Sequence, residues 1–173
     1  INHLTRSWCH PFGEPTFARE FRAIQHYRAL GIPALQAVYF AQRKQPDGTY
    51  AILITRALDG WTDLDAWLAN WSELSEFERS SVVVACAQLA KTLHAKGQMH
   101  GCFYPKHIFL REDAAQGFVA QLIDLEKTRR ILLGRRQRIK DLETLVRSTS
   151  RVWQQAEWRL FLEKVTQIID RIS

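Results

Sequence analysis

Residues 99–110 read "MHGCFYPKHIFL", and the interpretation of the whole chain depends on them. Polar and turn-forming side chains come first and an apolar run follows, in the order His100, Cys102, Pro105, His107 and then Ile108–Leu110. A short apolar run of this kind predicts a buried strand. The spacing is typical of a loop that carries catalytic groups and leads into such a strand.

A helix is expected well before this loop, in "PTFAREFRAIQHYRALGIP" from Pro15 to Pro33. Pro15 suits the start of a helix, and Gly31 suits the end. Apolar residues at helical spacing predict a buried stripe, made by Phe17, Phe21, Ile24 and Tyr27. Glu20 falls on or beside that stripe, so we expect its carboxylate to lie next to the core.

A hairpin is expected next. The segments "ALQAVYFAQRK" (34–44) and "YAILITRAL" (50–58) alternate in the manner of strands, and "QPDG" between them is a turn signal. A second, smaller hairpin is expected from "HIFLR" (107–111) and "FVAQLID" (118–124), with the turn "EDAAQG" between them.

Helices are expected in most of the remaining chain. Thr62 and Asp65 have a spacing like that of a capping box before a short helix, and Ser75 and Glu78 form a better one before "EFERSSVVVACAQLAKTLHAKG". The buried face of this long helix is expected from Val83, Ala87, Ala90, Leu93 and His94. Residues 139–152 and 154–172 read as two more helices, the last with a face made by Trp153, Leu160, Val165, Ile168 and Ile172. The order predicts an α+β fold, with a small sheet region before a larger helical one. His10, beside a proline, is expected in a loop.

The charge is +6 over 173 residues, and the excess is local. Seven cations fall within fourteen residues: Lys127, Arg129, Arg130, Arg135, Arg136, Arg138 and Lys140. They form either a solvated face or a surface for anions such as a phosphorylated sugar, a nucleotide, an anionic lipid or a nucleic acid. Three cysteines without a CxxC pair favour a reducing compartment, and with no apolar run long enough to span a membrane we expect a cytoplasmic protein. The chain begins at Ile1, and we expect residues upstream of it.

Two carboxylates have positions that suit phosphoryl transfer. Asp124 ends the apolar segment "AQLID", where a strand would aim it into a cleft. Glu20 lies on the first helix. Taken alone, each has an ordinary structural explanation, as a turn or capping aspartate and as a helix glutamate paired with a nearby arginine. Phosphoryl transfer needs a carboxylate for the metal ion, and often a glutamate that steadies a phosphate-binding lysine.

The chain resembles the lipopolysaccharide kinase family of Gram-negative bacteria, the WaaP/InaA group. The likeness rests on "LAKTLHAKGQMHGCFYPKHIFL", "QLIDLEKTRR" and "RIKDLETLVRS", and on "EPTFAREFRAIQHYRALGIPA" and "AILITRALDGWTDLDAWL", from about Glu14 to about Ser148. It implies a bilobal, protein-kinase-like fold with a partial N-lobe, made of helix C and the later strands. Residues 1–58 would be the remainder of that lobe and the hinge, and residues 59–173 a mostly helical C-lobe.

The resemblance also implies roles for individual residues. Glu20 would pair with a strand lysine that holds nucleotide phosphates. Thr55 would lie near the gatekeeper position, with Arg56, Ala57 and Leu58 forming the hinge beside adenine. His100 would support the catalytic loop, Asp141 would anchor that loop, and Asp124 and His107 would bind Mg²⁺. ATP and Mg²⁺ are the implied cofactors, and heptose or Kdo of the lipopolysaccharide core is the implied acceptor.

Two features depart from the family pattern. Cys102 stands where the family has its catalytic aspartate, and a thiol is a poor hydrogen-bond acceptor and a soft ligand for Mg²⁺. No glycine-rich loop or strand lysine precedes Glu20, and the fold would place both upstream of Ile1.

Three functions therefore remain open. The first is a kinase whose cations, such as Lys127, Arg129, Arg130, Arg135 and Arg136, bind a phosphorylated glycolipid or the anionic inner-membrane surface. The second is a pseudokinase that binds a nucleotide or a partner without transfer. The third, disfavoured because no nucleic-acid-binding motif is present, is a nucleic-acid-binding protein.

Overall fold

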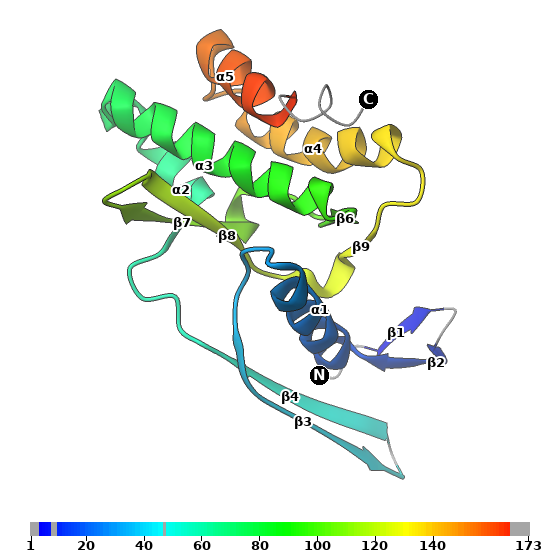
Figure 1. The fold of residues 1–173 in the computed structure, drawn as a ribbon. Coiled ribbons are helices and arrows are strands. Elements are labelled where there is room, and N and C mark those ends of the chain that lie inside the picture. The colour runs from blue at the N-terminus through cyan, green and yellow to red at the C-terminus, as the bar shows by residue number, and fades with distance from the viewer. Residues whose placement is uncertain (1–3, 8–9, 47, 167–173) are drawn as a thin grey trace.

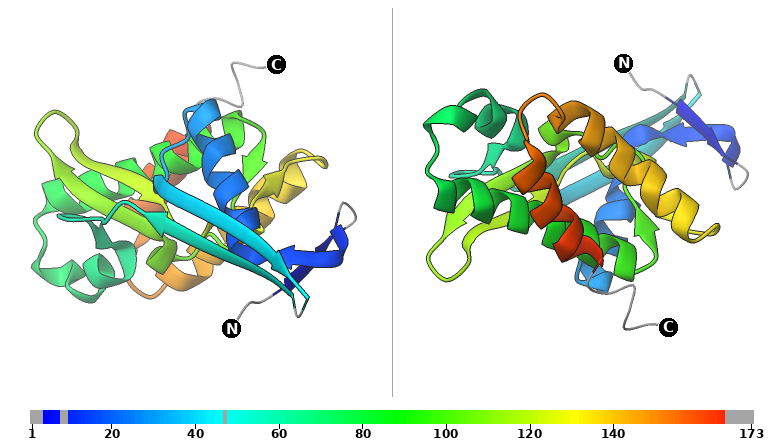
Figure 2. Two further views of the ribbon diagram at one scale, coloured as in Figure 1. Left: turned by 90° about the horizontal axis from the view of Figure 1, so that it is seen from below. Right: turned by 90° about the horizontal axis from the view of Figure 1, so that it is seen from above.

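A computed structural model describes the chain except for residues 1–3, 8–9, 47 and 167–173. Its N-terminal part begins with an antiparallel pair of strands, β1 (Leu4–Ser7) and β2 (His10–Pro15), which leads into helix α1 (Thr16–Leu30). Strands β3 (Ala37–Gln45) and β4 (Gly48–Thr55) form a second hairpin. This hairpin lies along α1 and extends away from the helical part of the molecule (Figures 1 and 2).

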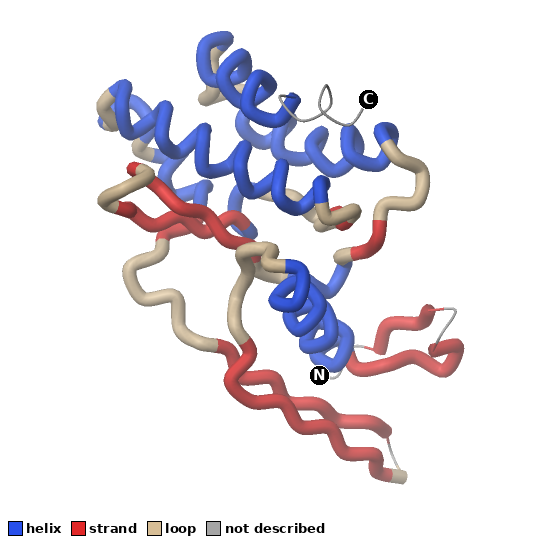
Figure 3. The backbone as a smooth tube through the Cα atoms, viewed as in Figure 1, coloured by secondary structure: helices blue, strands red, loops and turns tan. Residues whose placement is uncertain are grey.

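The C-terminal part combines four helices with short strands. Helices α3, α4 and α5 lie on one side of the β7–β8 hairpin (Figures 1 and 3). A three-stranded sheet has the order β5–β7–β8, and β6 pairs with β9 in a separate two-stranded ribbon. The helices are α2 (Leu64–Ala69), α3 (Glu76–Ala95), α4 (Arg135–Thr149) and α5 (Gln155–Thr166). The strands are β5 (Thr62–Asp63), β6 (Gln98–Met99), β7 (Ile108–Asp113), β8 (Gly117–Leu122) and β9 (Arg129–Arg130), and the 3-10 turns are η1 (Trp71–Glu73), η2 (Pro105–His107) and η3 (Leu125–Lys127).

The segment after α1 joins the two parts. Its backbone pairs with the end of β8, because Leu122 N–H donates to the carbonyl of Pro33 and Leu35 N–H donates to the carbonyl of Leu122. One hydrophobic core runs through both parts, from Ile24 and Tyr27 of α1 to Phe161 of α5. The position of α1 is therefore coupled to the loops that follow β6 and β8. Within the described residues, no helix is both long and apolar enough to cross a membrane.

Most of the expected elements are confirmed, and α3 is the clearest. Ser75 and Glu78 form the full capping box, with each side chain bonded to the backbone of the other residue. The five residues expected on its inner face are all buried. Since Val82, Ala85, Cys86 and Leu89 are buried as well, the helix is enclosed on more than one face.

Several local expectations were wrong. The cap of α2 is Asp63, not Thr62, because the Asp63 carboxylate accepts a hydrogen bond from Ala66 N–H. Phe17 is 47% exposed, and Ala18 takes the buried place in the first turn of α1. His10 begins β2 rather than lying in a loop, and the strands β1 and β2 before α1 were not expected.

The C-terminal helices also differ from expectation. Helix α4 begins at Arg135 and ends at Thr149, so it starts inside the basic segment. Trp153 precedes α5, and Phe161 is the fully buried residue of that helix. Ile168 and Ile172 lie outside the described residues. Helical spacing located the apolar face, but the packing of three neighbouring aromatic rings, Trp153, Trp158 and Phe161, determined which side chain is enclosed.

Candidate active site

The loop that contains His100 and Cys102 is held by one buried carboxylate from α4. Asp141 Oδ2 accepts a hydrogen bond from His100 N–H at 2.9 Å, and Oδ1 accepts one from Gly101 N–H at 2.8 Å. His94 Nε2, at the end of α3, lies 3.1 Å from Oδ2. Burial by itself would raise the pKa of Asp141, but the bonds from His94, His100 and Gly101 outweigh burial and hold the pKa below its usual value.

His100 connects this loop to the segment after β8. Its Nε2–H donates to the carbonyl of Ile123 at 2.9 Å, and the ring is fully buried. Burial lowers the pKa of His100, more than the Ile123 carbonyl and Asp141 raise it, so the ring is neutral. His100 therefore links its own loop to the segment after β8 through hydrogen bonds. It is not positioned to exchange protons with a substrate.

His107 and Asp124 face each other across the site. The Nδ1–H of His107 donates to the carbonyl of Cys102 at 2.9 Å, which leaves Nε2 pointing toward Asp124, 3.2 Å from Oδ2. Asp124 has a left-handed backbone conformation, with φ 54° and ψ 62°, which is rare for a residue with a side chain. Strained backbone of this kind is concentrated at functional sites, and here it turns the carboxylate toward His107.

A pocket of about 350 Å³ brings together five of the residues that the sequence indicated. Glu20 from α1, Thr55 from β4, Arg56 and Leu58 from the following segment, and Asp124 all line it. Leu35 and Ile123 supply apolar walls. Ala57, between two lining residues, does not line the pocket. Apolar walls with a few convergent polar groups are usual for a small-molecule site.

The pKa of Glu20 is raised in this pocket. Burial, followed by the nearby carboxylate of Asp124, raises the pKa of Glu20, although the backbone N–H of Leu125 donates to it and partly opposes the rise. Within the described residues no cation forms an ion pair with Glu20. Nearby positive charge favours the ionised forms of two carboxylates that face one pocket, and Arg56 lines the same pocket.

The residue types at the site fit Mg²⁺. Mg²⁺ is usually held by one or two carboxylates, with substrate phosphates and water completing an octahedron, so a full cage of protein ligands is not needed. Asp124 supplies the oxygen and His107 Nε2 a neighbouring lone pair. In the part of the chain that the structure describes, no group of three or more His, Cys, Asp or Glu side chains is placed to hold a metal ion.

Cys102 lies beside this pocket but is not among its lining residues. Its side chain is partly exposed, and its carbonyl accepts hydrogen bonds from His107 Nδ1–H and from Tyr104 N–H. Tyr104 and Lys106 are the polar neighbours of Cys102 in sequence, and Lys106 Nζ lies over the Tyr104 ring, 6.0 Å from its centre. Neither supplies a carboxylate.

The basic segment lies outside this pocket. Lys127 lies 3.9 Å from the carboxylate of its neighbour Glu126. Arg129 and Arg130 form β9 and lie against the outer side of α1, whereas Arg135 and Arg136 begin α4. The five cations expected to bind substrate are thus placed at three separate positions, and none of them lines the pocket that contains Asp124.

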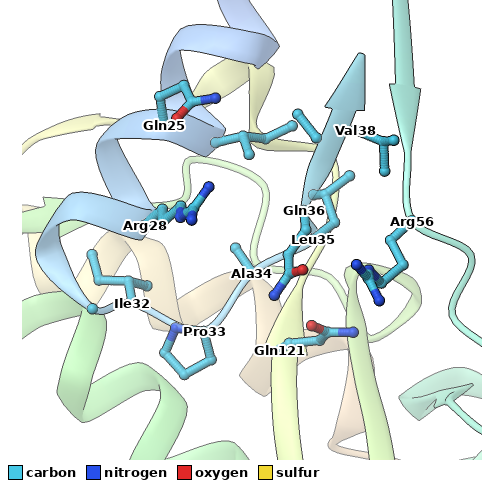
Figure 4. Close-up of a pocket in the computed structure, with 13 residues that line it drawn as sticks. Gln25, Arg28, Ile32, Pro33, Ala34, Leu35, Gln36, Val38, Arg56 and Gln121 are labelled. Atoms are coloured by element: carbon cyan, nitrogen blue, oxygen red, sulfur yellow. The ribbon is translucent and has the colours of Figure 1, made fainter.

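A larger cavity, of about 560 Å³, lies beside the segment that joins α1 to β3 (Figure 4). Arg28 and Gln25 reach it from α1, Gln36 and Arg56 from the two sides of the β3–β4 hairpin, and Gln121 from β8. None of its lining residues is acidic, and neither Asp124 nor His107 contributes to it. We therefore place the chemistry in the smaller pocket, with which this cavity shares Arg56.

Two contributions to the site were not identified from the sequence. Gly101 has φ 78°, and a Cβ there would lie 2.7 Å from the carbonyl oxygen of Lys127. Tyr27 is fully buried, and its hydroxyl donates to the carbonyl of Met99 at 3.4 Å. Burial raises the pKa of Tyr27, so the phenol stays neutral. Neither role has a specific sequence signal. A glycine that follows a histidine is common, and so is a tyrosine in a helical apolar stripe, and both roles depend on contacts with residues distant in sequence.

Comparison with known proteins gives the family. The model of the lipopolysaccharide kinase (Kdo/WaaP) family matches residues 1–164. Protein InaA of Escherichia coli (strain K12) is 32% identical over 136 residues, which are 76% of this chain and 61% of InaA, so the chain spans about three fifths of that relative's length. The solved structure described as WaaP in complex with acyl carrier protein aligns with a TM-score of 0.73 and 24% identity, over 91% of this chain and 68% of that one. This likeness confirms the predicted protein-kinase-like fold. The chain belongs to the lipopolysaccharide kinase (Kdo/WaaP) family.

Proposed function

We propose that this protein is an ATP-dependent kinase that phosphorylates a sugar, heptose or Kdo, of the lipopolysaccharide core. The observation that carries the proposal is the convergence of Glu20, Asp124 and the segment from Thr55 to Leu58 on one pocket, with His107 Nε2 3.2 Å from Asp124. These residues come from four separate parts of the sequence. A structural explanation for each residue alone does not account for their convergence on one pocket that contains two carboxylates.

Each residue has a defined task in this proposal. ATP supplies the phosphoryl group when it is bound. Asp124 and His107 would hold Mg²⁺, the segment from Thr55 to Leu58 would lie beside adenine, and Glu20 would pair with a lysine that binds the phosphates. Asp141 and His100 keep the loop around Cys102 in position through the hydrogen bonds described above. Catalysis of phosphoryl transfer depends mainly on such positioning and charge neutralisation.

Membership of the family supports the proposed acceptor and location. We propose a cytoplasmic protein that approaches its lipid-linked acceptor at the anionic inner-membrane surface. The exposed arginines of β9 and of the start of α4 (Arg129, Arg130, Arg135 and Arg136) support a phosphorylated glycolipid as acceptor, because guanidinium groups bind phosphate in a bidentate manner.

A second candidate is a pseudokinase that binds nucleotide in the same pocket without transfer. Cys102 favours it, since the position lacks a carboxylate to accept the proton of the attacking hydroxyl, and neither Tyr104 nor Lys106 replaces one. The two candidates share the pocket and differ only in the chemical step.

One experiment separates them. Mg²⁺-dependent ATP binding would be titrated calorimetrically, and transfer of radiolabelled phosphate to a purified, delipidated lipopolysaccharide core would be measured in parallel. Transfer that is lost in Asp124→Ala supports the kinase. Binding without transfer, with a gain of transfer in Cys102→Asp, supports the pseudokinase. If neither binding nor transfer occurs, both candidates are wrong.

A further inference from the structure

The loop between β9 and α4 presents two leucines to solvent. Leu132 is 81% exposed and Leu133 is 72% exposed. Figure 1 shows this loop at the edge of the molecule, away from the packed helices. Single apolar side chains are common on protein surfaces, but two adjacent leucines with most of their surface in water form a small apolar projection.

The conformation of this loop is held by specific hydrogen bonds. Gln137, in the first turns of α4, accepts hydrogen bonds through Oε1 from the backbone N–H groups of Leu132 at 2.5 Å and Leu133 at 2.7 Å. Before them, Ile131 N–H donates to the carbonyl of Gly97 at 2.8 Å. The loop is fixed at both ends, so the leucines are held outward by the backbone.

Cations flank the leucines on both sides. Arg129 and Arg130 precede them and Arg135 and Arg136 follow them, and all four are exposed. In the described ranges none of the four forms an ion pair with an acidic side chain. The two arginines at the start of α4 also lie where the helix dipole disfavours positive charge, and its first turn contains no acidic residue. The positive charge of these four arginines is therefore not neutralised by acidic side chains in the described part of the fold.

A pocket lined by arginines lies beside the loop. It has a volume of about 280 Å³, and it lies between α1 and the β6–β9 ribbon. Its lining residues include arginines from both elements and no acidic residue: Arg19 and Arg22 of α1, beside His26, with Arg129 and Arg130 of β9. Arg22 is already engaged by Glu14, at 2.6 and 2.7 Å, whereas Arg19 forms no ion pair among the described residues. A phosphate group bound between these arginines would offset the repulsion between their positive charges.

We propose that this surface docks on an anionic lipid bilayer, with Leu132 and Leu133 inserted at the boundary of headgroups and acyl chains. Arg19, Arg129 and Arg130 bind a lipid phosphate in the adjacent pocket, and Arg135 and Arg136 lie along the headgroups. Apolar insertion and electrostatic attraction together give stable peripheral binding, where either alone is weak. The proposal rests on the proposed function for the lipid-linked acceptor, but docking itself requires no phosphoryl transfer.

Docking at this place would orient the candidate active site. Arg129 follows Asp124 by five residues, and the two are joined by η3. Arg19 is the neighbour of Glu20 on α1. A bilayer bound here would therefore contact both elements that contribute carboxylates to the site, and it would hold the site close to an acceptor anchored in the same membrane.

The test is sedimentation of the protein with vesicles of phosphatidylcholine, with and without 30% phosphatidylglycerol. We expect binding only to the anionic vesicles. Leu132→Ser/Leu133→Ser is expected to lower the partition coefficient about tenfold, and Arg129→Gln/Arg130→Gln to lower it by a similar factor at low salt. Phe77→Ser is the matched control, because Phe77 is also 72% exposed but lies between Glu76 and Glu78, and we expect less than a twofold change.

Three results would overturn the proposal. The first is no binding to anionic vesicles, which is expected of a surface that binds another protein instead. The second is an equal loss of vesicle binding in Phe77→Ser, and the third is vesicle binding that does not change in Leu132→Ser/Leu133→Ser. Thermal unfolding of each variant checks that it is folded. Transfer to the delipidated, water-soluble core is expected to be unchanged in Leu132→Ser/Leu133→Ser. If the native protein binds vesicles but transfers no phosphate, the kinase proposal is wrong and the docking proposal stands.

Discussion

Nε2 of His107 lies 3.2 Å from Oδ2 of Asp124, while Nδ1–H of the same ring is committed to the carbonyl of Cys102. The carbonyl fixes the tautomer in which Nε2 carries the lone pair whenever the ring is neutral. A nitrogen and an oxygen at this separation can serve as adjacent ligands to one divalent cation.

The first prediction concerns metal selectivity. Imidazole favours transition metals such as Ni²⁺, whereas Mg²⁺ favours oxygen. We expect His107→Asn to weaken Ni²⁺-dependent ATP binding by about tenfold or more and Mg²⁺-dependent binding by much less, since the carboxamide oxygen replaces the nitrogen. Calorimetric titration of ATP in each metal measures both effects. Asp124→Ala should abolish binding in both metals, and His26→Asn, outside the site, should alter neither; equal losses for the two metals in His107→Asn would contradict metal ligation by His107.

The second prediction is a pH dependence that comes from Glu20. Its pKa is raised in the folded protein by burial and by Asp124, so its ionisation destabilises the fold. Below the ordinary pKa of a glutamate the group is protonated in both states and costs nothing; as pH rises above that value the penalty grows, and it is complete above the raised pKa. Glu20→Gln should therefore be more stable to urea than the native chain near pH 7, and equally stable near pH 4. Glu112 is exposed on β7, so Glu112→Gln is the control and should show no such pH-dependent difference in stability.

The third prediction concerns Asp141. Asp141→Ala leaves the N–H groups of His100 and Gly101 buried without an acceptor, which should lower the free energy of unfolding by about 3 kcal/mol. Because the pKa of Asp141 is held below its usual value, this stabilisation is present above the ordinary aspartate pKa and is lost as pH falls through the lowered one. Urea unfolding of both proteins between pH 2 and pH 7 measures it. A difference that stays constant to pH 2 would show that the carboxylate charge does not matter.

The fourth prediction compares two glycines near one loop. Both have positive φ, 67° at Gly97 and 78° at Gly101, but a Cβ at Gly97 meets open space. Gly97→Ala should therefore lose only the backbone term, about 1 kcal/mol. Gly101→Ala should lose this and also displace the Lys127 carbonyl, for a total of about 3 kcal/mol or more, together with weaker ATP binding. Equal unfolding free energies for the two variants would mean that the close approach to Lys127 is not maintained in solution.

Much of the fold could be predicted because its signals are local. The capping box at Ser75, the turn at "QPDG" and the helical stripe from Phe21 to Tyr27 each act within a few residues. The prediction failed at Phe17 because periodicity states which residues share a face, but neighbouring elements determine how much of that face is covered. Phe21 stacks on Phe40 of β3, 4.4 Å between ring centres, and this leaves Phe17 outside the contact.

The sequence by itself determined the family, the order of the elements and the identity of the residue at position 102, because covalent order and motif spacing are properties of the chain. Only the tertiary structure decided that Glu20 and Asp124 face one pocket, that Asp141 holds the loop of His100, and that the basic segment separates into a pocket against α1 and a loop that exposes Leu132 and Leu133. These relations join residues tens of positions apart. They arise when α1, α4 and the β7–β8 hairpin pack on a common core, and no local preference specifies the distances that result.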